Sequence, residues 1–86
     1  LGGGNFGGHC DGDQLAKKLN WAVSQGLVVT VSAGNDGDGV SSPACASGAI
    51  AVGATDKLNV RPGWSNFGSA LDLVAPGVDI LSTYSC

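Results

Sequence analysis

The sequence predicts an α/β fold with parallel sheet strands, one main helix and short C-terminal strands. Apolar residues at helical spacing extend from Leu15 to Val23, and an apolar, β-branched run, Leu27–Ser32, follows almost directly. A second apolar run, Ala49–Thr55, comes after a stretch rich in small residues. A helix followed by one buried strand and then another is typical of a parallel sheet with a covering helix.

The helix is predicted to begin at the segment Asp11-Gly-Asp-Gln14. An Asp11 cap accepts hydrogen bonds from the free amides of the first turn, and Gln14, three residues on, can reach back to it. The helix is predicted to end at Gly26, because glycine readily adopts the left-handed backbone conformation that terminates helices. The apolar stripe at positions i, i+4, i+7 and i+8 consists of Leu15, Leu19, Ala22 and Val23. The side chains expected to face away from it are Lys17, Lys18, Asn20 and Gln25.

Leu27–Ser32 is apolar on both faces and is predicted to be a buried, central parallel strand. The following residues, 33–39, form a loop by composition, because Gly, Asn and Asp tolerate positive φ angles. Ligands of open α/β sheets bind beyond the carboxyl ends of the strands, so this loop is the expected place for a site. Residues 41–48 form a second loop of small residues.

The C-terminal part changes to polar turns after Asp56. Leu71–Val74 and Val78–Leu81 alternate around Pro76-Gly77, which predicts two short strands joined by a turn. No repeat, linker or domain boundary is visible in the sequence.

Composition excludes several classes of protein. With 43% hydrophobic and 13% charged residues, the 86-residue chain has the composition of a small globular unit, and its 15 glycines indicate many tight turns. A net charge of −3 with four Lys and Arg argues against nucleic acid as a partner. No apolar run approaches the length of a bilayer span, so we expect no membrane partner either.

The cysteines Cys10, Cys45 and Cys86 lack the C-x-x-C spacing of zinc and iron–sulfur sites. Spacing alone leaves two interpretations open. Either one disulfide forms and one cysteine is left over, or all three are free thiols.

Several motifs match a known chemistry only in part. Gly2-x-Gly4-x-x-Gly7 matches the dinucleotide fingerprint, but residues 9–12 intervene before the helix. In Gly63-Trp-Ser-Asn-Phe67 the last position must be glycine for a nucleophile elbow, so Ser65 is interpreted as a turn residue. His9 is interpreted as a solvated side chain. Neither Asp-Gly-Asp segment is followed by the glutamate that an EF-hand requires at its twelfth position.

Asn35 differs from these motifs because it follows a buried strand through two small residues, Ala33 and Gly34. Its carboxamide can therefore project into a cleft and donate a hydrogen bond to a developing oxyanion. By spacing alone a simple turn cap is the more frequent role for such an asparagine.

Six stretches line up in order with the subtilisin-like serine peptidases, and the resemblance covers essentially the whole chain. They are Leu1–Gly3, Val28–Gly37, Ser42–Ala44, Ala51–Asp56, Trp64–Gly68 and Leu71–Gly77. The resemblance implies a partial subtilisin-like three-layer fold. Residues 1–86 are then expected to be an internal segment of the peptidase domain, with the remainder of that domain as a partner.

By this resemblance Asn35 looks like the family's oxyanion asparagine, which stabilises the tetrahedral intermediate of acyl transfer. The implied partner is an extended peptide or protein substrate. The residues implied to bind it are Leu1, Gly2 and Gly3 along its backbone, and Ser32, Ala33, Gly34 and Ala44 around the primary specificity pocket.

The resemblance also implies a structural calcium ion, held by Asp72 and by the backbone carbonyls of Ser47 and Ala49. It further implies a Cys10–Cys45 disulfide, because the two loops are neighbours in the family fold. Family members are usually secreted, so an extracellular location is expected.

The triad motifs of the family, Asp-[Ser/Thr]-Gly, His-Gly-Thr and Gly-Thr-Ser-Met-Ala, do not occur in the chain. The isolated 86 residues are therefore expected to be inactive and to expose apolar surface. An alternative interpretation is a non-catalytic remnant or pseudoenzyme module that binds extended peptides along residues 1–3.

Overall fold

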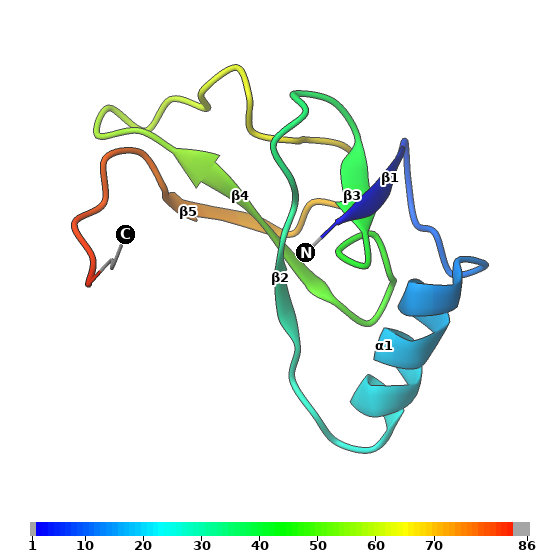
Figure 1. Cartoon of the computed structure of the whole chain (residues 1–86). Helices are drawn as coiled ribbons and strands as arrows, with labels where there is room; N and C mark the ends of the chain where they lie inside the picture. Colours follow the sequence, from blue (N-terminus) through cyan, green and yellow to red (C-terminus); the bar gives the residue numbers. More distant parts are fainter. Residues whose placement is uncertain (1, 84–86) are drawn as a thin grey trace.

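The chain folds into two small sheets and one helix (Figure 1), and the computed structural model describes residues 2–83. The order of elements is β1 (Gly3–Phe6), α1 (Gln14–Ser24), β2 (Thr30–Ser32), β3 (Val40–Ser42), β4 (Ile50–Thr55) and β5 (Leu73–Pro76). Strands β2, β4 and β5 form a parallel sheet in the order β2-β4-β5, and β1 pairs with β3 in an antiparallel ribbon. The predicted α/β class is confirmed.

Helix α1 is capped by Asp13 and not, as predicted, by Asp11. The Asp13 side chain accepts a hydrogen bond from the Ala16 amide at 3.4 Å. Asp11 instead accepts hydrogen bonds from the Asn20 carboxamide and the Ser47 amide. The predicted stop is confirmed, because the helix ends at Ser24 and Gly26 has a φ of +95°.

The buried face of α1 is rotated from the predicted stripe. Ala16 is the buried residue of the helix, whereas Leu15 is 46% exposed. Asn20 faces the protein and not solvent, since its carboxamide oxygen accepts a hydrogen bond from the Gly48 amide at 2.8 Å. The side chains that form the core are mostly alanines, and a small Ala16 lets the helix approach them closely.

Among residues 2–83 the parallel sheet has β4 between β2 and β5, so the strand predicted as central at 27–32 has a neighbouring strand on one side only within this part of the chain. The strand is also shorter than predicted, beginning at Thr30. Leu27 and Val28 are 59% and 81% exposed. Their apolar character indicates a surface that no element among residues 2–83 covers.

Strand β5 is the first of the two predicted C-terminal strands, and it continues through Pro76 in parallel with β4. The predicted second strand, 78–81, and the turn at Pro76-Gly77 are not present. Asp79 has a φ of 55°, which interrupts the extended backbone that a strand needs.

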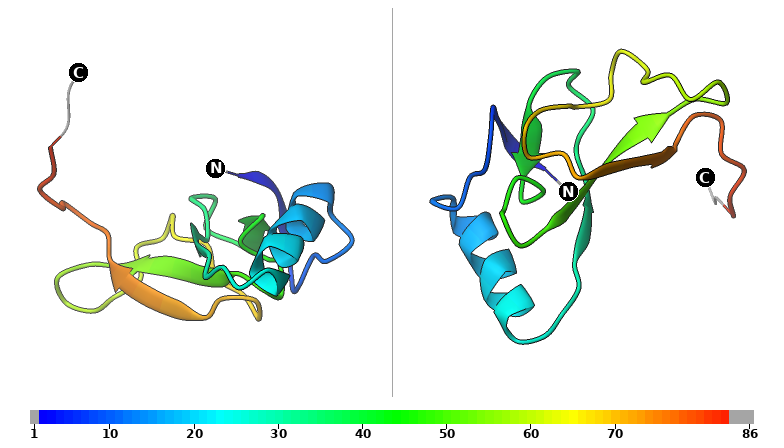
Figure 2. Two further views of the ribbon diagram at one scale, coloured as in Figure 1. Left: turned by 90° about the horizontal axis from the view of Figure 1, so that it is seen from below. Right: turned by 180° about the vertical axis from the view of Figure 1, so that it is seen from behind.

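Helix α1 and the β1–β3 ribbon lie on the same side of the parallel sheet (Figure 2). The core forms between them from small side chains such as Ala33, Ala51 and Ala70, together with Val40. Cys10 and Cys45 lie in this core as a disulfide with a Cα–Cα distance of 5.3 Å. Of the two interpretations left open by the cysteine spacing, the structure has the disulfide.

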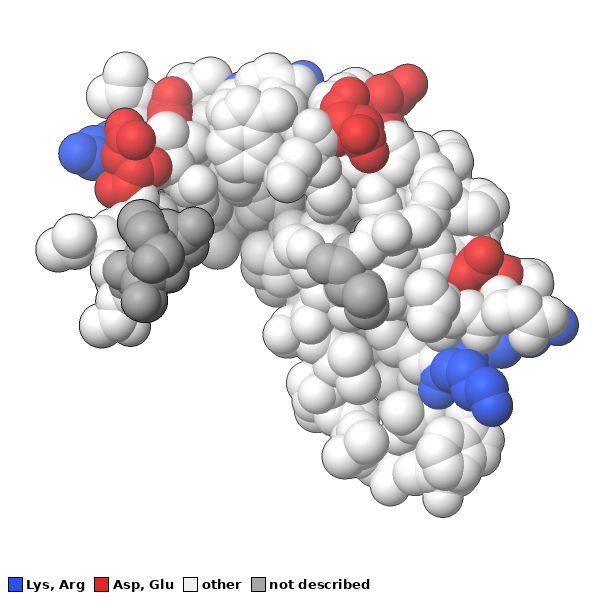
Figure 3. Space-filling model, viewed as in Figure 1, with Lys and Arg blue, Asp and Glu red and all other residues white. Residues whose placement is uncertain are grey.

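The charged side chains on the face seen in Figure 3 lie mostly toward its edges. No helix among the described residues is long and apolar enough to cross a membrane.

Candidate functional site

Asn35 lies in the loop that follows β2, as the sequence predicts, and its side chain is exposed. Gly34 has a φ of +111°, in the left-handed region that favours glycine. A Cβ atom at Gly34 would also collide with the side chains of Asn66 and Ser41. The loop therefore needs glycine immediately before Asn35 for both conformation and space.

Two open cavities meet at Asn35. One, here called the strand-end cavity, has a volume of about 480 Å³ and lies at the ends of β2, β4 and β5. The other, the glycine cavity, has a volume of about 640 Å³ and is lined by Gly2, Gly3 and Gly4. Asn35 lines both cavities, so its carboxamide is accessible to a ligand in either.

The glycine cavity brings together most of the residues predicted to bind substrate. Gly2 and Gly3 line it from one side, and Ser32, Gly34 and Asn35 line it from the β2 end. These two segments are about thirty residues apart in sequence. Their meeting at one cavity places the Asn35 residue beside the glycines that are predicted to bind the substrate backbone.

Three other predicted residues lie elsewhere. Ala33 is buried and lines the strand-end cavity. Ala44 is only 1% exposed and lies in the core, where it lines neither cavity. Leu1 lies outside the described residues.

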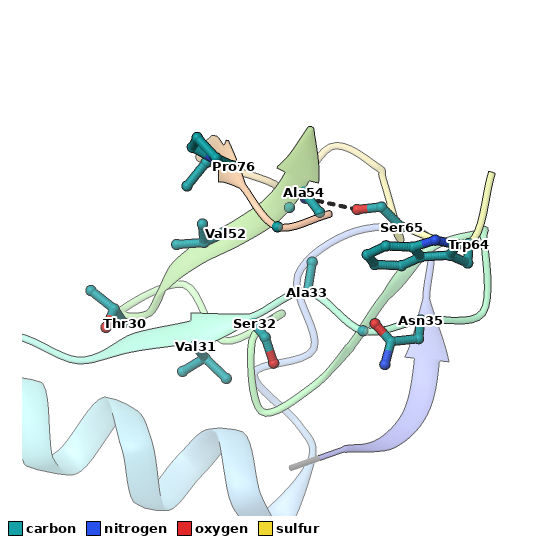
Figure 4. Close-up of a pocket in the computed structure, with 14 residues that line it drawn as sticks. Thr30, Val31, Ser32, Ala33, Asn35, Val52, Ala54, Trp64, Ser65 and Pro76 are labelled. Atoms are coloured by element: carbon teal, nitrogen blue, oxygen red, sulfur yellow. Dashed lines mark hydrogen bonds between the residues drawn. The ribbon is translucent and has the colours of Figure 1, made fainter. Parts of the chain in front are cut away.

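The residues after β4 complete the strand-end cavity. In the close-up of Figure 4, the Asn35 carboxamide projects beneath the indole of Trp64. The Ser65 hydroxyl accepts a hydrogen bond from the Ala54 amide at 2.9 Å, and Ser65 is 1% exposed. The Ser65 amide donates to the Pro62 carbonyl at 3.1 Å, so Ser65 lies in a turn, as predicted.

Asn66 was missed as a site residue by sequence reasoning. It is 0% exposed, and its carboxamide contacts the backbone on both sides of Asn35. Asn66 lies within Trp64–Gly68, one of the six stretches of family resemblance, and this was a sequence feature that could have marked it as a site residue. Nothing in the local sequence, however, indicated which distant loop this side chain would reach.

Strand β1 offers one edge to a ligand. Its other edge pairs with β3, with Gly3 opposite Ser42 and Phe6 opposite Val40. Gly4 has a φ of +54° and accompanies a register shift between Gly3 and Asn5. Among residues 2–83 no third strand joins this ribbon, which leaves the edge beside the glycine cavity available to an extended peptide.

Asp72 was predicted as a calcium ligand, and it is exposed at the start of β5. One carboxylate oxygen accepts a hydrogen bond from the Ala51 amide at 2.7 Å, which fixes Asp72 beside β4. Ala51 lies two residues after Ala49 in the sequence. The second carboxylate oxygen is a hard donor of the kind that calcium prefers. The described residues contain no group of three or more His, Cys, Asp or Glu side chains suited to a metal.

Hydrogen bonding lowers the pKa of Asp11. The Ser47 backbone amide has the largest effect, and the Asn20 carboxamide adds to it. Asp11 thereby joins the beginning of α1 to residue 47, whose carbonyl is one of the predicted calcium ligands.

Two other sequence motifs take no part in a site. His9 is exposed, as predicted, with Nδ1 3.3 Å from the Cys45 carbonyl oxygen. The helix begins at Gln14 and not at Gly7, so the glycines at 2, 4 and 7 do not form a dinucleotide-binding turn.

Comparisons with known proteins agree with this geometry. Residues 5–86 match the model of the peptidase S8 subtilase family. Over 71 residues the chain is 48% identical to Subtilisin Savinase from Lederbergia lenta, a match covering 81% of this chain and 26% of the relative. Subtilisin-like protease 2 from Pseudogymnoascus destructans is also 48% identical, over 85% of this chain and 20% of the relative.

A solved structure, that of the prenylagaramide maturation protease PagA, superimposes with a TM-score of 0.77 at 30% identity. The match covers 93% of this chain and 30% of that one. The chain thus spans about a quarter of the length of its relatives. Family model, sequence identity and fold all lead to one assignment: the chain belongs to the subtilase family of serine peptidases.

Proposed function

We propose that this chain is part of a serine endopeptidase, in which Asn35 donates a hydrogen bond to the oxyanion formed during peptide-bond hydrolysis. The observation that carries the proposal is the position of Asn35. It follows β2 at the carboxyl end of a parallel sheet and lines two open cavities at once. Membership of the subtilase family supports this role.

An amide donor in this position acts on the transition state. As the substrate carbonyl becomes tetrahedral, its oxygen gains negative charge and attracts the Asn35 N–H more strongly than the planar carbonyl does. The barrier falls because the stabilisation is greater in the transition state than in the bound substrate. The nucleophile and the general base are not among the motifs of this chain.

The peptide substrate is proposed to lie along β1 and beside the glycine cavity. The absence of side chains at Gly2 and Gly3 lets a peptide backbone approach, and the open edge of β1 supplies hydrogen-bonding groups. Ser32 and Gly34 form the opposite wall. These small residues suit a roomy specificity pocket.

Two further properties belong to the same proposal. A calcium ion is held by Asp72 together with the carbonyls of Ser47 and Ala49. It would join the segment before β4 to the residue before β5. The protein works outside the cell. The disulfide between Cys10 and Cys45 supports this location, since disulfides persist in oxidising compartments.

The test uses a chimaera, defined as Subtilisin Savinase with its matching segment replaced by this chain. In the chimaera, Asn35→Ala should lower kcat by about 10²–10³ for a chromogenic peptide amide and change KM little. That magnitude is the loss measured in subtilisin itself when an oxyanion-hole asparagine is removed, carried over to the chimaera.

The matched control is Asn59→Gly, which removes another exposed carboxamide, outside both cavities and at a φ of 60° that glycine tolerates. It should leave kcat unchanged. If Asn35→Ala altered only the binding of peptide and left kcat intact, the oxyanion role would be wrong and the peptide-binding module would be favoured.

A further inference from the structure

Asn66 is a fully buried asparagine whose carboxamide is hydrogen-bonded on all sides. Its Nδ2 donates to the Ala33 carbonyl oxygen at 2.9 Å and to the Ser41 hydroxyl at 3.1 Å. Its Oδ1 accepts from the Asp36 amide at 2.7 Å and from the Asp38 amide at 3.3 Å. Its exposed fraction is 0%.

These contacts enclose Asn35 along the chain. Ala33 lies two residues before it, and Asp36 directly follows it. The main-chain amide of Asn66 adds a bond to the Gly34 carbonyl at 3.0 Å. A single residue from the loop between β4 and β5 therefore holds the backbone immediately before and immediately after the proposed oxyanion donor.

Only a carboxamide fits this set of partners. It has two N–H donors on one side and an oxygen that accepts twice on the other. An aspartate lacks both donors and would put a charge next to the Ala33 carbonyl, and a serine is too short to reach both sides. Within the described residues no buried side-chain nitrogen or oxygen lacks a partner, so the network is complete.

The packing around Gly34 points to the same function. A Cβ atom there would meet the Asn66 carboxamide and the Ser41 hydroxyl, so these side chains fill the space under the loop. Gly37 is held as well, because its amide donates to the Trp64 carbonyl at 3.0 Å. The segment 64–66 thus acts as a support for residues 33–38.

We infer that Asn66 is a positioning residue for Asn35, fixing the direction in which the Asn35 carboxamide enters the cleft. The inference rests on the proposed function, because it assigns Asn66 a role only through Asn35. Preorganised donors are effective because they need no reorganisation at the moment of reaction. A small displacement of the loop therefore lowers kcat, while peptide binding elsewhere in the cleft changes less.

The experiment compares Asn66→Ser and Asn66→Asp with the parent chimaera. Each should lower kcat by about 10- to 100-fold, with a smaller change in KM, in enzyme shown to be folded by its thermal unfolding curve. The two variants remove different contacts: the Asp variant would keep the side-chain volume and both accepted bonds but lose both donated bonds, whereas the Ser variant shortens the side chain. Each variant is assayed at a temperature at which its unfolding curve shows it folded.

A double-mutant cycle with Asn35→Ala separates positioning from general support. If Asn66 acts through Asn35, adding Asn66→Ser to Asn35→Ala should cause little further loss of kcat. The control is Asn20→Ser. Asn20 is another asparagine that bridges two segments, through Asp11 and Gly48, but it lines neither cavity. Its substitution should therefore lower stability and leave kcat unchanged.

The outcomes distinguish the two claims. If Asn35→Ala does not lower kcat, the proposed oxyanion function fails. The positioning inference alone fails in two cases in which Asn35→Ala lowers kcat. In one, the Asn66 substitutions leave kcat unchanged. In the other, the kcat loss of the double variant equals the product of the two single losses. Failure of both Asn66 variants to fold would likewise overturn positioning in favour of a purely structural role.

Discussion

The Ser42 hydroxyl donates a hydrogen bond to the Asp13 carboxylate, the same group that caps α1. This contact joins the beginning of the helix to strand β3 across 29 residues of sequence. The Ser42 bond has the largest effect in holding the pKa of Asp13 below its ordinary value of 3.8. The Ala16 amide also lowers this pKa, and desolvation opposes both.

The lowered pKa of Asp13 predicts a loss of stability in acid. Because the folded state favours the ionised carboxylate, the contribution is fully present above about pH 3.8 and is lost as the pH falls through the lower folded-state pKa. Urea unfolding of the chimaera between pH 6 and pH 2 should show this loss. In the Ser42→Ala variant the free energy of unfolding should fall less between pH 6 and pH 2. The same pH profile in variant and parent would contradict a role for the Ser42 bond in lowering the Asp13 pKa.

The disulfide predicts a direct cost for removing either cysteine. Cys10 and Cys45 are 35 residues apart in sequence, and cross-links that close loops of this kind stabilise proteins by roughly 2–4 kcal/mol. The double variant Cys10→Ser/Cys45→Ser should unfold at lower denaturant by about that free energy. Mass analysis of the unreduced chimaera should find both thiols oxidised, and two free thiols would refute the bond.

The calcium proposal predicts a ligand-dependent stability that needs Asp72. Calcium at about 100 times its Kd should stabilise the parent chimaera by roughly 2.7 kcal/mol at one site. Asp72→Asn should reduce this gain, since the amide oxygen can still accept from Ala51 but the ligand charge is gone. Asp79→Asn serves as the control, because Asp79 lies outside the proposed ligand set. Equal calcium responses in all three proteins would exclude the site.

The isolated chain should hydrolyse no peptide above the buffer background. Asn35 can stabilise an oxyanion only after a nucleophile has attacked, and none of the three triad motifs occurs in the 86 residues. The purified chain and the chimaera would be assayed side by side with the same chromogenic peptide. Turnover by the isolated chain that a serine-directed inhibitor abolishes would disprove this prediction.

Local patterns predicted the elements whose signals lie within a few residues. The helix with its Gly26 stop, strand β4 and the first C-terminal strand were recognised from spacing, β-branching and turn residues. The β1–β3 ribbon was not predicted from propensity, because glycines such as Gly3 and Gly4 are unfavourable in strands and because Ser41 and Ser42 were assigned to a loop. Those strands form because they pair with each other, which is a tertiary contact.

The sequence by itself determined the order of helix α1 and strands β2, β4 and β5, the family, and the place of Asn35 after β2. The order of these elements and the place of Asn35 follow from short-range periodicity and turn composition, and the family follows from the six stretches of resemblance. Only the tertiary structure decided that β4 lies between β2 and β5, that Asp13 caps α1, that Ala44 lies in the core and that Asn66 contacts the backbone on both sides of Asn35. These depend on which distant segments approach each other, because burial and hydrogen-bond partners are properties of the packed chain and not of its local sequence.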